Sequence, residues 1–200
     1  MMELFLNATS PYARLVRVVV LEKDLAEAVT LRWCDPWADE AALLDANPAG
    51  RIPALTTEDG STLSESILIA VYLDGLGDRA PLIPDACRAF VLHLAGLGQA
   101  LMDTAFTTVI NRKHHGHQAD DSLLGQRRWR AIQRLLSRLD NELADKAGAS
   151  VTLGDIAVAV ALEYLTFRLP ETAWQEHWPG LAAWHHNMAK RHSIARTAFQ

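Results

Sequence analysis

Residues 47–73 read NPAGRIPALTTEDGSTLSESILIAVYL, and this stretch decides how the rest of the chain is interpreted. It opens on Asn-Pro-Ala-Gly, a turn sequence in which proline fixes φ and glycine is free to take a positive φ. A short extended run follows at 51–57, and Asp59-Gly60 is a hairpin signal between two apolar runs. Capping residues at 64–66 then precede apolar residues at helical spacing. The pattern predicts a strand, a turn, a very short strand and a helix.

The start of that helix is a candidate binding site. Ser64, Glu65 and Ser66 lie where free backbone N–H groups and the positive end of the helix dipole favour a carboxylate, while Glu65 favours an ammonium group. A site that pairs the two fits the α-amino acid end of a ligand. The strand that enters at Ile52-Pro53 would offer unpaired backbone groups to an extended peptide. A small peptide with a free amino-acid head is one interpretation, and a plain helix cap is the other.

The segments NPAGRIPAL, DG and LSESILIAVYL together resemble the glutathione-binding half of the soluble glutathione transferases. The usual form in that family is N-P-x-G-x-V-P-x-L, followed by an Asp/Asn-Gly turn and a Glu-Ser pair. The chain departs from this form only at Ile52, where valine is commoner. The resemblance extends over essentially all 200 residues and is to a bacterial, serine-type member of the family.

The resemblance implies a role for each matching residue. Ile52 would pair its backbone with the cysteinyl part of glutathione, and the peptide bond to Pro53 would be cis. Glu65 and Ser66 would hold the γ-glutamyl end. Arg51 lies where the family often has Lys or Gln; it either reaches the glycyl carboxylate or is a surface cation at the start of a strand. Glutathione is thus the expected co-substrate.

Ser10 is the candidate for stabilising the thiolate of glutathione. A free thiol titrates near ~8.5, and lowering that pKa by about 2 units corresponds to roughly 2.7 kcal/mol. A hydroxyl donor and a helix N-terminus together supply such an effect. Ser10 follows the first predicted strand and precedes Pro11, so it can cap the first helix and still donate its O–H. Thr9 and Tyr12 are the competing candidates, and the lack of a cysteine here argues against glutaredoxin-like or omega-type chemistry.

The order of predicted elements in the first part of the chain is β-α-β-α-β-β-α. This alternation indicates an α/β domain, and the resemblance makes it thioredoxin-like. Glycines and prolines then break the pattern, and no strand pattern follows. We therefore predict a thioredoxin-like domain at 1–77, a linker at 78–85 and an all-α domain at 86–200. The helices expected in the second domain lie at 87–114, 122–147, 152–168 and 181–190.

Neither of two conspicuous motifs in the second domain is assigned to catalysis or to metal binding. Thr152-Leu-Gly-Asp155 is a capping box ahead of a buried helix. The run at 114–117, His-His-Gly-His, resembles a metal cluster, but consecutive histidines diverge, so no metal site is expected. The resemblance places the pocket for the second substrate in this domain. Its wall is assigned to Met102, Phe106 and His114.

Composition limits the location and the partners of the chain. The net charge of −5 argues against a nucleic-acid binder, and the arginines at 127–138 are read as the solvated face of a helix. Cys34 and Cys87 lack metal spacing and fit reduced thiols. The start of the chain has no basic region before an apolar run, and no stretch approaches ~18 apolar residues. A cytoplasmic protein without membrane contact is expected.

The sequence therefore predicts a two-domain glutathione transferase, forming a homodimer and serving detoxification. The thiolate would attack an electrophilic carbon of a small, mostly apolar substrate held in the second domain's pocket. Isomerisation or dehalogenation with glutathione as cofactor would use the same first domain. A binding or regulatory protein that keeps this fold without the chemistry is the alternative of a different class.

Overall fold

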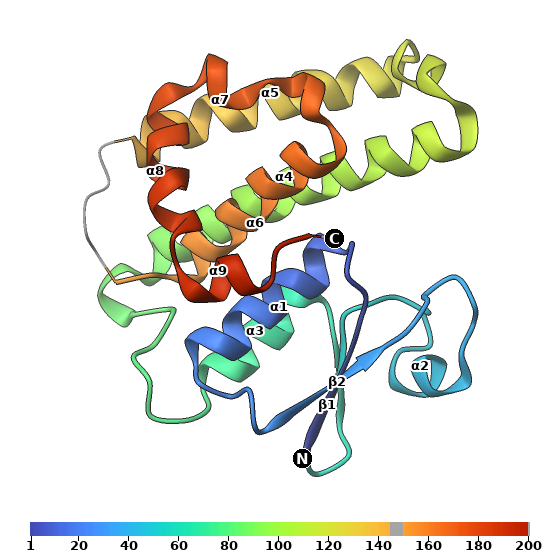
Figure 1. The fold of residues 1–200 in the computed structure, drawn as a ribbon, viewed down its shortest axis with the longest axis vertical. Coiled ribbons are helices and arrows are strands. Elements are labelled where there is room, and N and C mark those ends of the chain that lie inside the picture. Colours follow the sequence, from blue (N-terminus) through green and yellow to red (C-terminus); the bar gives the residue numbers. More distant parts are fainter. Residues whose placement is uncertain (145–149, 200) are drawn as a thin grey trace. The chain divides into compact units, whose positions relative to one another are not determined.

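The structure is a computed structural model of the chain, and it describes residues 1–144 and 150–199. Contacts divide the described residues into two compact units, 1–88 together with 192–199, and 89–191. The first unit holds a small sheet with helices, and the second consists of helices (Figure 1). The predicted order of an α/β region followed by a helical region is confirmed.

The sheet of the first unit has four strands in the order β2-β1-β3-β4. Strand β1 pairs parallel with β2 and antiparallel with β3, and β3 pairs antiparallel with β4. The strands are β1 (Met2–Leu6), β2 (Val29–Trp33), β3 (Ala54–Thr56) and β4 (Thr62–Ser64). The turn that joins β3 to β4 carries Gly60 at φ 84, the positive value that the Asp-Gly pair predicts.

Helices α1 (Pro11–Glu22) and α3 (Ser66–Asp74) lie side by side along the sheet (Figure 1). Leu4 and Leu6 of β1 are completely buried and point to one face of the sheet, because side chains alternate along a strand. Phe5 points to the other face, where it packs in a cluster with Leu43 of α2 (Ala41–Ala46). The sheet therefore has apolar contacts on both faces.

A buried ion pair joins the ends of α1 and α3. Lys23 Nζ lies 3.3 Å from Asp74 Oδ1, with the two side chains 2% and 9% exposed. Asp74 also accepts hydrogen bonds from the backbone N–H groups of Leu82 (2.7 Å) and Ile83 (3.1 Å). Lys23 in turn donates to the carbonyl of Arg79 at 3.0 Å. These contacts hold residues 79–83, most of the predicted linker, against the first unit.

The second unit is built around α6 (Leu153–Arg168), most of whose side chains are buried. A Cβ on Gly98 of α4 would lie 2.6 Å from the backbone of Ala157 in α6, so glycine permits this close helix approach. The helices are α4 (Arg88–His115), α5 (Leu123–Leu143), α6 (Leu153–Arg168), α7 (Trp174–His177) and α8 (Pro179–Ala189). The capping box before α6 is present, as predicted. Trp174 and Trp184 are buried, and Trp178 is half-buried.

The predicted helices agree with the observed ones within two residues at 87–114, 152–168 and 181–190, as well as at the start of the helix expected at 122–147. That helix ends at Leu143 in the structure, and residues 145–147 lie outside the described part. The short helices α7 and α9 (His192–Arg196) were not expected, because four and five residues carry too little periodicity to recognise. The contacts group α9 with the first unit, whereas the sequence assigns it to the helical domain.

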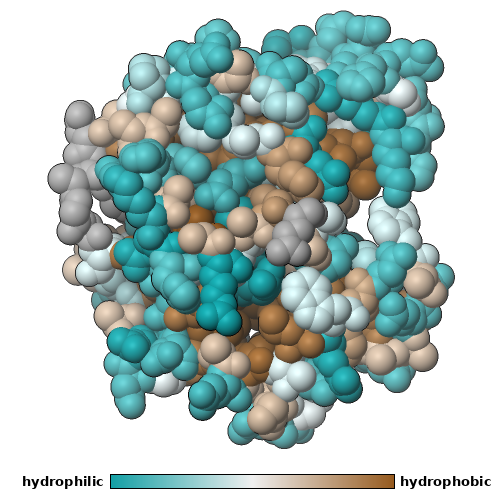
Figure 2. Space-filling model, viewed as in Figure 1, coloured by the Kyte–Doolittle hydropathy of each residue, from teal (hydrophilic) through white to brown (hydrophobic). Residues whose placement is uncertain are grey.

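The sequence was expected to hold no stretch long and apolar enough for a membrane helix, and one helix departs from that expectation. The helical stretch Asp85–His115 is long and apolar enough, by length and composition alone, to cross a membrane. The core helix of a soluble protein passes the same test. On the face drawn in Figure 2, hydrophilic side chains cover most of the surface and hydrophobic areas lie between them.

Candidate functional site

The register of the sheet brings three segments of the first unit to one end. Phe5 of β1 lies opposite Ala54 of β3, and Ala54 lies opposite Ser64 of β4. The residues after β1, those before β3 and those after β4 therefore meet at the same end of the sheet. Helices α1 and α3 both begin there. This end thus holds two helix N-termini, which favour anionic groups.

Ser10 is the N-cap of α1, and its Oγ accepts a hydrogen bond from the backbone N–H of Ala13 at 3.2 Å. Its own N–H donates to Asn7 Oδ1 at 2.8 Å, and the N–H of Thr9 donates to the same oxygen at 3.1 Å. Asn7 thus shapes the turn that presents Ser10. Sequence reasoning gave Asn7 no role, although Asn two or three residues before a cap is a known turn signal.

The chain enters β3 through a cis peptide bond between Ile52 and Pro53, as the resemblance implies. Asn47 is buried and holds the approach to this bond, donating from Nδ2 to the carbonyl of Arg51 at 2.8 Å. Within the described chain, the backbone N–H and C=O of Ile52 make no hydrogen bond. They are therefore available to an extended ligand, as the sequence interpretation requires.

Glu65 is the N-cap of α3 and has φ 68 and ψ 116, an unusual backbone conformation for a residue with a side chain. Such a conformation is unfavourable by about 1–3 kcal/mol and occurs most often at binding sites. Ser66, the first residue of the helix, is only 3% exposed. The carboxylate of Glu65 therefore belongs to the residue at the helix N-terminus, and the next residue, Ser66, is buried.

Arg51 forms an ion pair with Glu65, with Nη2 2.5 Å from Oε1. The two side chains are 69% and 56% exposed, so solvent screens the pair and its contribution to stability is small. The structure thus brings together Ser10, Arg51, Ile52, Pro53, Glu65 and Ser66 at one end of the sheet. It places the Arg51 guanidinium on Glu65, which neither sequence interpretation of Arg51 included.

Cys34 also lies at this end of the sheet, because Leu6 of β1 is opposite Trp33 of β2. Burial raises the pKa of the Cys34 thiol above its usual value, and the carboxylates of Glu40 and Asp35 act in the same direction. A thiol with a raised pKa stays protonated near neutral pH and is a poor nucleophile. This environment therefore does not activate the Cys34 thiol as a nucleophile.

The residues expected to line the second-substrate pocket all lie on α4, in the second unit. Met102 is completely buried, Phe106 is half-buried and His114 is exposed. Their role stays a prediction. The rings of His114 and His115 are 6.5 Å apart and tilted, and no group of three His, Cys, Asp or Glu residues in the described chain could hold a metal ion.

Comparison with known proteins identifies the family. The sequence pattern of the glutathione S-transferase N-terminal domain matches residues 9–76, and that of the C-terminal domain matches residues 124–187. The chain belongs to the glutathione S-transferase family. It is 30% identical to the uncharacterized GST-like protein YibF of Escherichia coli K12 over 98% of both chains.

Two solved structures of glutathione transferases resemble the chain over its whole length. The glutathione transferase family member of Pseudomonas fluorescens Pf-5, with bound glutathione, has a TM-score of 0.91 and 33% identity, and each chain covers 100% of the other. The enzyme of Methylobacillus flagellatus KT, also with glutathione bound, has a TM-score of 0.90 and 32% identity at the same coverage. Glutathione binding is thus seen in these structural neighbours.

Proposed function

We propose that the chain binds glutathione at the end of its sheet and transfers the thiolate to a small, mostly apolar electrophile. The observation that carries the proposal is the meeting of three features at that end. These are the unpaired backbone of Ile52, the Glu65 carboxylate in its unusual conformation and the N-terminus of α1 with Ser10 as cap. The glutathione bound in the two neighbouring structures supports the same ligand.

Each part of glutathione has a matching group. The γ-glutamyl carboxylate would accept hydrogen bonds at the N-terminus of α3, where Ser66 begins the helix, and the ammonium group would pair with Glu65. The cysteinyl residue would form backbone hydrogen bonds with Ile52, as an added strand does. In this arrangement the sulfur would face the turn between β1 and α1, where Ser10 lies.

Ser10 then stabilises the thiolate. Its oxygen already accepts the N–H of Ala13, so its own O–H remains to donate to sulfur. The Thr9 hydroxyl, in contrast, lies 3.5 Å from Asn7 Oδ1 and donates toward it. This contact supports the choice of Ser10 over Thr9. The sulfur attacks an electrophilic carbon, forming the S–C bond as the leaving group departs or the double bond shifts its electrons.

For the electrophile we propose a pocket wall that includes Met102, Phe106 and His114, which are buried, half-buried and exposed in that order. The proposed reaction needs no metal, since the thiolate is the nucleophile and the protein supplies orientation and hydrogen bonds. Reduced glutathione is a cytoplasmic co-substrate, so we place this activity in the cytoplasm.

Replacing Glu65 with glutamine is expected to raise the dissociation constant of glutathione roughly ten- to hundredfold, because a charge-assisted hydrogen bond to the ammonium group is lost. Calorimetric titration near neutral pH measures this constant. Glu58→Gln is the matched control, since Glu58 is a similarly exposed carboxylate of the same unit and pairs with the terminal amine of Met1.

The same titration decides the role of Arg51. If Arg51 only pairs with Glu65, Arg51→Gln should leave glutathione binding unchanged or tighten it; if Arg51 reaches the glycyl carboxylate, binding should weaken. A wild-type chain that fails to bind millimolar glutathione would contradict the proposal and favour a regulatory role. Binding without conjugation of aryl halides would instead favour isomerisation or dehalogenation.

We also propose a homodimer, and an exposed apolar face of α3 supports it. Leu68, Val71 and Tyr72 lie on one face of the helix and are 62%, 43% and 38% exposed. Replacing Leu68 with glutamate should therefore shift the mass in sedimentation equilibrium from dimer to monomer. Leu123→Glu, at a residue 77% exposed on α5, is the control that should keep the dimer mass. A wild-type chain that sediments as a monomer would contradict this proposal.

A further inference from the structure

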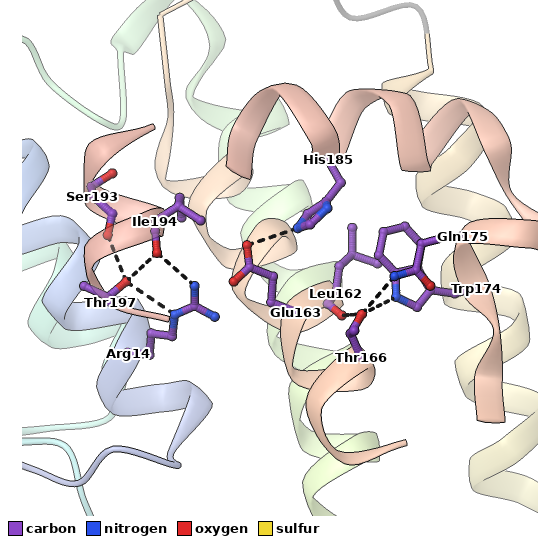
Figure 3. A network of polar contacts seen from close by, with 10 residues as sticks. All are labelled: Arg14, Leu162, Glu163, Thr166, Trp174, Gln175, His185, Ser193, Ile194 and Thr197. Atoms are coloured by element: carbon purple, nitrogen blue, oxygen red, sulfur yellow. Dashed lines mark hydrogen bonds and ion pairs between the residues drawn. The ribbon is translucent and has the colours of Figure 1, made fainter. Parts of the chain in front are cut away.

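Residues 192–199, here called the chain end, are held against the first helix of the glutathione-binding unit. Helix α9 lies beside α1 within the same unit (Figures 1 and 3). A helix of five residues is not stable alone, so its contacts with α1 must hold it. Ser193, Ile194 and Thr197 are all less than 5% exposed, which shows that this contact is a packed one.

Arg14 of α1 makes the central contact. Its side chain is 2% exposed, and its Nη2 donates to the carbonyl of Ile194 at 3.1 Å while Nε donates to Thr197 Oγ1 at 3.3 Å (Figure 3). The Thr197 hydroxyl donates in turn to the carbonyl of Ser193 at 2.8 Å. The guanidinium carbon of Arg14, Cζ, lies 4.4 Å from the centroid of the Phe199 ring. A planar guanidinium suits this combination of two directed hydrogen bonds and a stacked ring.

A second contact fixes the other end of α1. Ser193 Oγ donates to a carboxylate oxygen of Glu22, the last residue of the helix, at 2.5 Å. The chain end therefore contacts α1 near its beginning and at its end. Two such contacts fix the position of α1 better than one could.

Arg14 also shares a helical turn with Ser10. The backbone N–H of Arg14 donates to the carbonyl of Ser10 at 3.1 Å, which closes the first turn of α1. First turns have few hydrogen bonds of their own and fray most easily. The buried Arg14 side chain anchors this turn through the chain end, and the Ser10 hydroxyl moves with the turn.

We infer that residues 192–199 form part of the support of the glutathione site, and that Arg14 is a positioning residue that acts through the chain end on Ser10. The inference rests on the proposed function, in which Ser10 contacts the sulfur. If the hydrogen bond to Thr197 is lost while the segment stays packed on Arg14, the buried guanidinium keeps fewer partners, which is an unfavourable state. The first turn would then have to move to expose the charge to water, and the hydroxyl would lose its place beside the sulfur.

Thr197→Val tests this inference with little change of volume. It removes the acceptor of Arg14 Nε and the donor to Ser193, so we expect the dissociation constant of glutathione to rise about two- to threefold. The pKa of the bound thiol should also rise, measured from thiolate absorbance against pH. Thr108→Val is the matched control, because Thr108 is equally buried and bonds the carbonyl four residues before it, in the second unit. Arg14→Lys keeps the charge but not the planar geometry and should give an intermediate thiol pKa.

Amide hydrogen exchange supplies a readout that needs no glutathione. The amides of Ala13 and Arg14 should exchange faster in Thr197→Val than in Thr108→Val, since the first turn of α1 is no longer anchored. The inference is overturned if Thr197→Val matches Thr108→Val in glutathione affinity, thiol pKa and exchange of these amides. A wild-type chain that binds no glutathione refutes the proposed function instead, and the exchange comparison still decides whether the chain end anchors α1.

Discussion

Ser10→Ala should lower glutathione-dependent turnover with an aryl halide by up to roughly 50-fold at about pH 6.5, the limit in which the Ser10 hydroxyl alone lowers the thiol pKa by about 2 units from ~8.5. Turnover falls because a smaller fraction of the bound glutathione is present as thiolate in the variant. The serine O–H donates to sulfur from the N-terminus of α1, and alanine removes that donor while the helix stays in place. Glutathione affinity should change only a few-fold, since the γ-glutamyl contacts with Glu65 and Ser66 remain.

The difference in turnover between the wild type and Ser10→Ala should depend on pH. A lowered thiol pKa means that the wild-type enzyme gains its thiolate at lower pH than the variant does. Turnover of the variant should therefore approach that of the wild type as the pH rises, and the two should nearly agree above about pH 9.5, where both thiols are ionised. A loss of turnover that is the same at every pH would contradict a role in thiol ionisation.

Ser122→Ala is the control for the capping role of Ser10. Ser122 caps α5 in the second unit, and its Oγ accepts the N–H of Gly125 at 3.0 Å, much as Ser10 accepts that of Ala13. Both substitutions should cost about 1 kcal/mol of stability. Only Ser10→Ala should alter the pH profile of turnover. Equal profiles for both variants would assign Ser10 to helix capping alone.

Local sequence patterns were sufficient for much of the fold and for the candidate site. The turn, the Asp-Gly hairpin and the capping residues between 47 and 73 predicted β3, β4 and the start of α3. The family resemblance added the cis bond at Pro53. These features succeed because each depends on residues that are neighbours in sequence, where backbone preference and hydrogen bonding act directly.

Contacts between distant residues were beyond such patterns. The pairing of Lys23 with Asp74, and that of Arg14 with Thr197, join residues that no periodicity relates. The pairing of Arg51 with Glu65 depends on the return of β4 beside β3, which brings the two residues together. The positive φ of Glu65 was missed because residue type does not signal it: residues other than glycine seldom adopt a positive φ.

Asp155→Ala is expected to lower the free energy of unfolding by about 2–4 kcal/mol, a large part of the 5–15 kcal/mol typical of a folded protein. Asp155 Oδ2 accepts hydrogen bonds from the Thr152 N–H at 2.9 Å and from its hydroxyl at 2.7 Å. Both residues are buried, at 3% and 7% exposure, so water cannot replace the lost acceptor and the Thr152 N–H is left unsatisfied. The effect should also reach beyond the cap, since α6 is the most buried helix of its unit.

Thermal and denaturant unfolding measure this loss, and the melting temperature should fall by roughly 5–15 °C. Asp155→Asn should be milder, because the amide keeps an acceptor oxygen for the Thr152 N–H. Ser122→Ala serves here too as the exposed comparison, since water can reach the backbone groups that its cap leaves open. If Asp155→Ala lost no more stability than Ser122→Ala, burial of the capping box would not be the source of its strength. An unchanged glutathione affinity in folded Asp155→Ala would assign this aspartate to folding and not to the glutathione site.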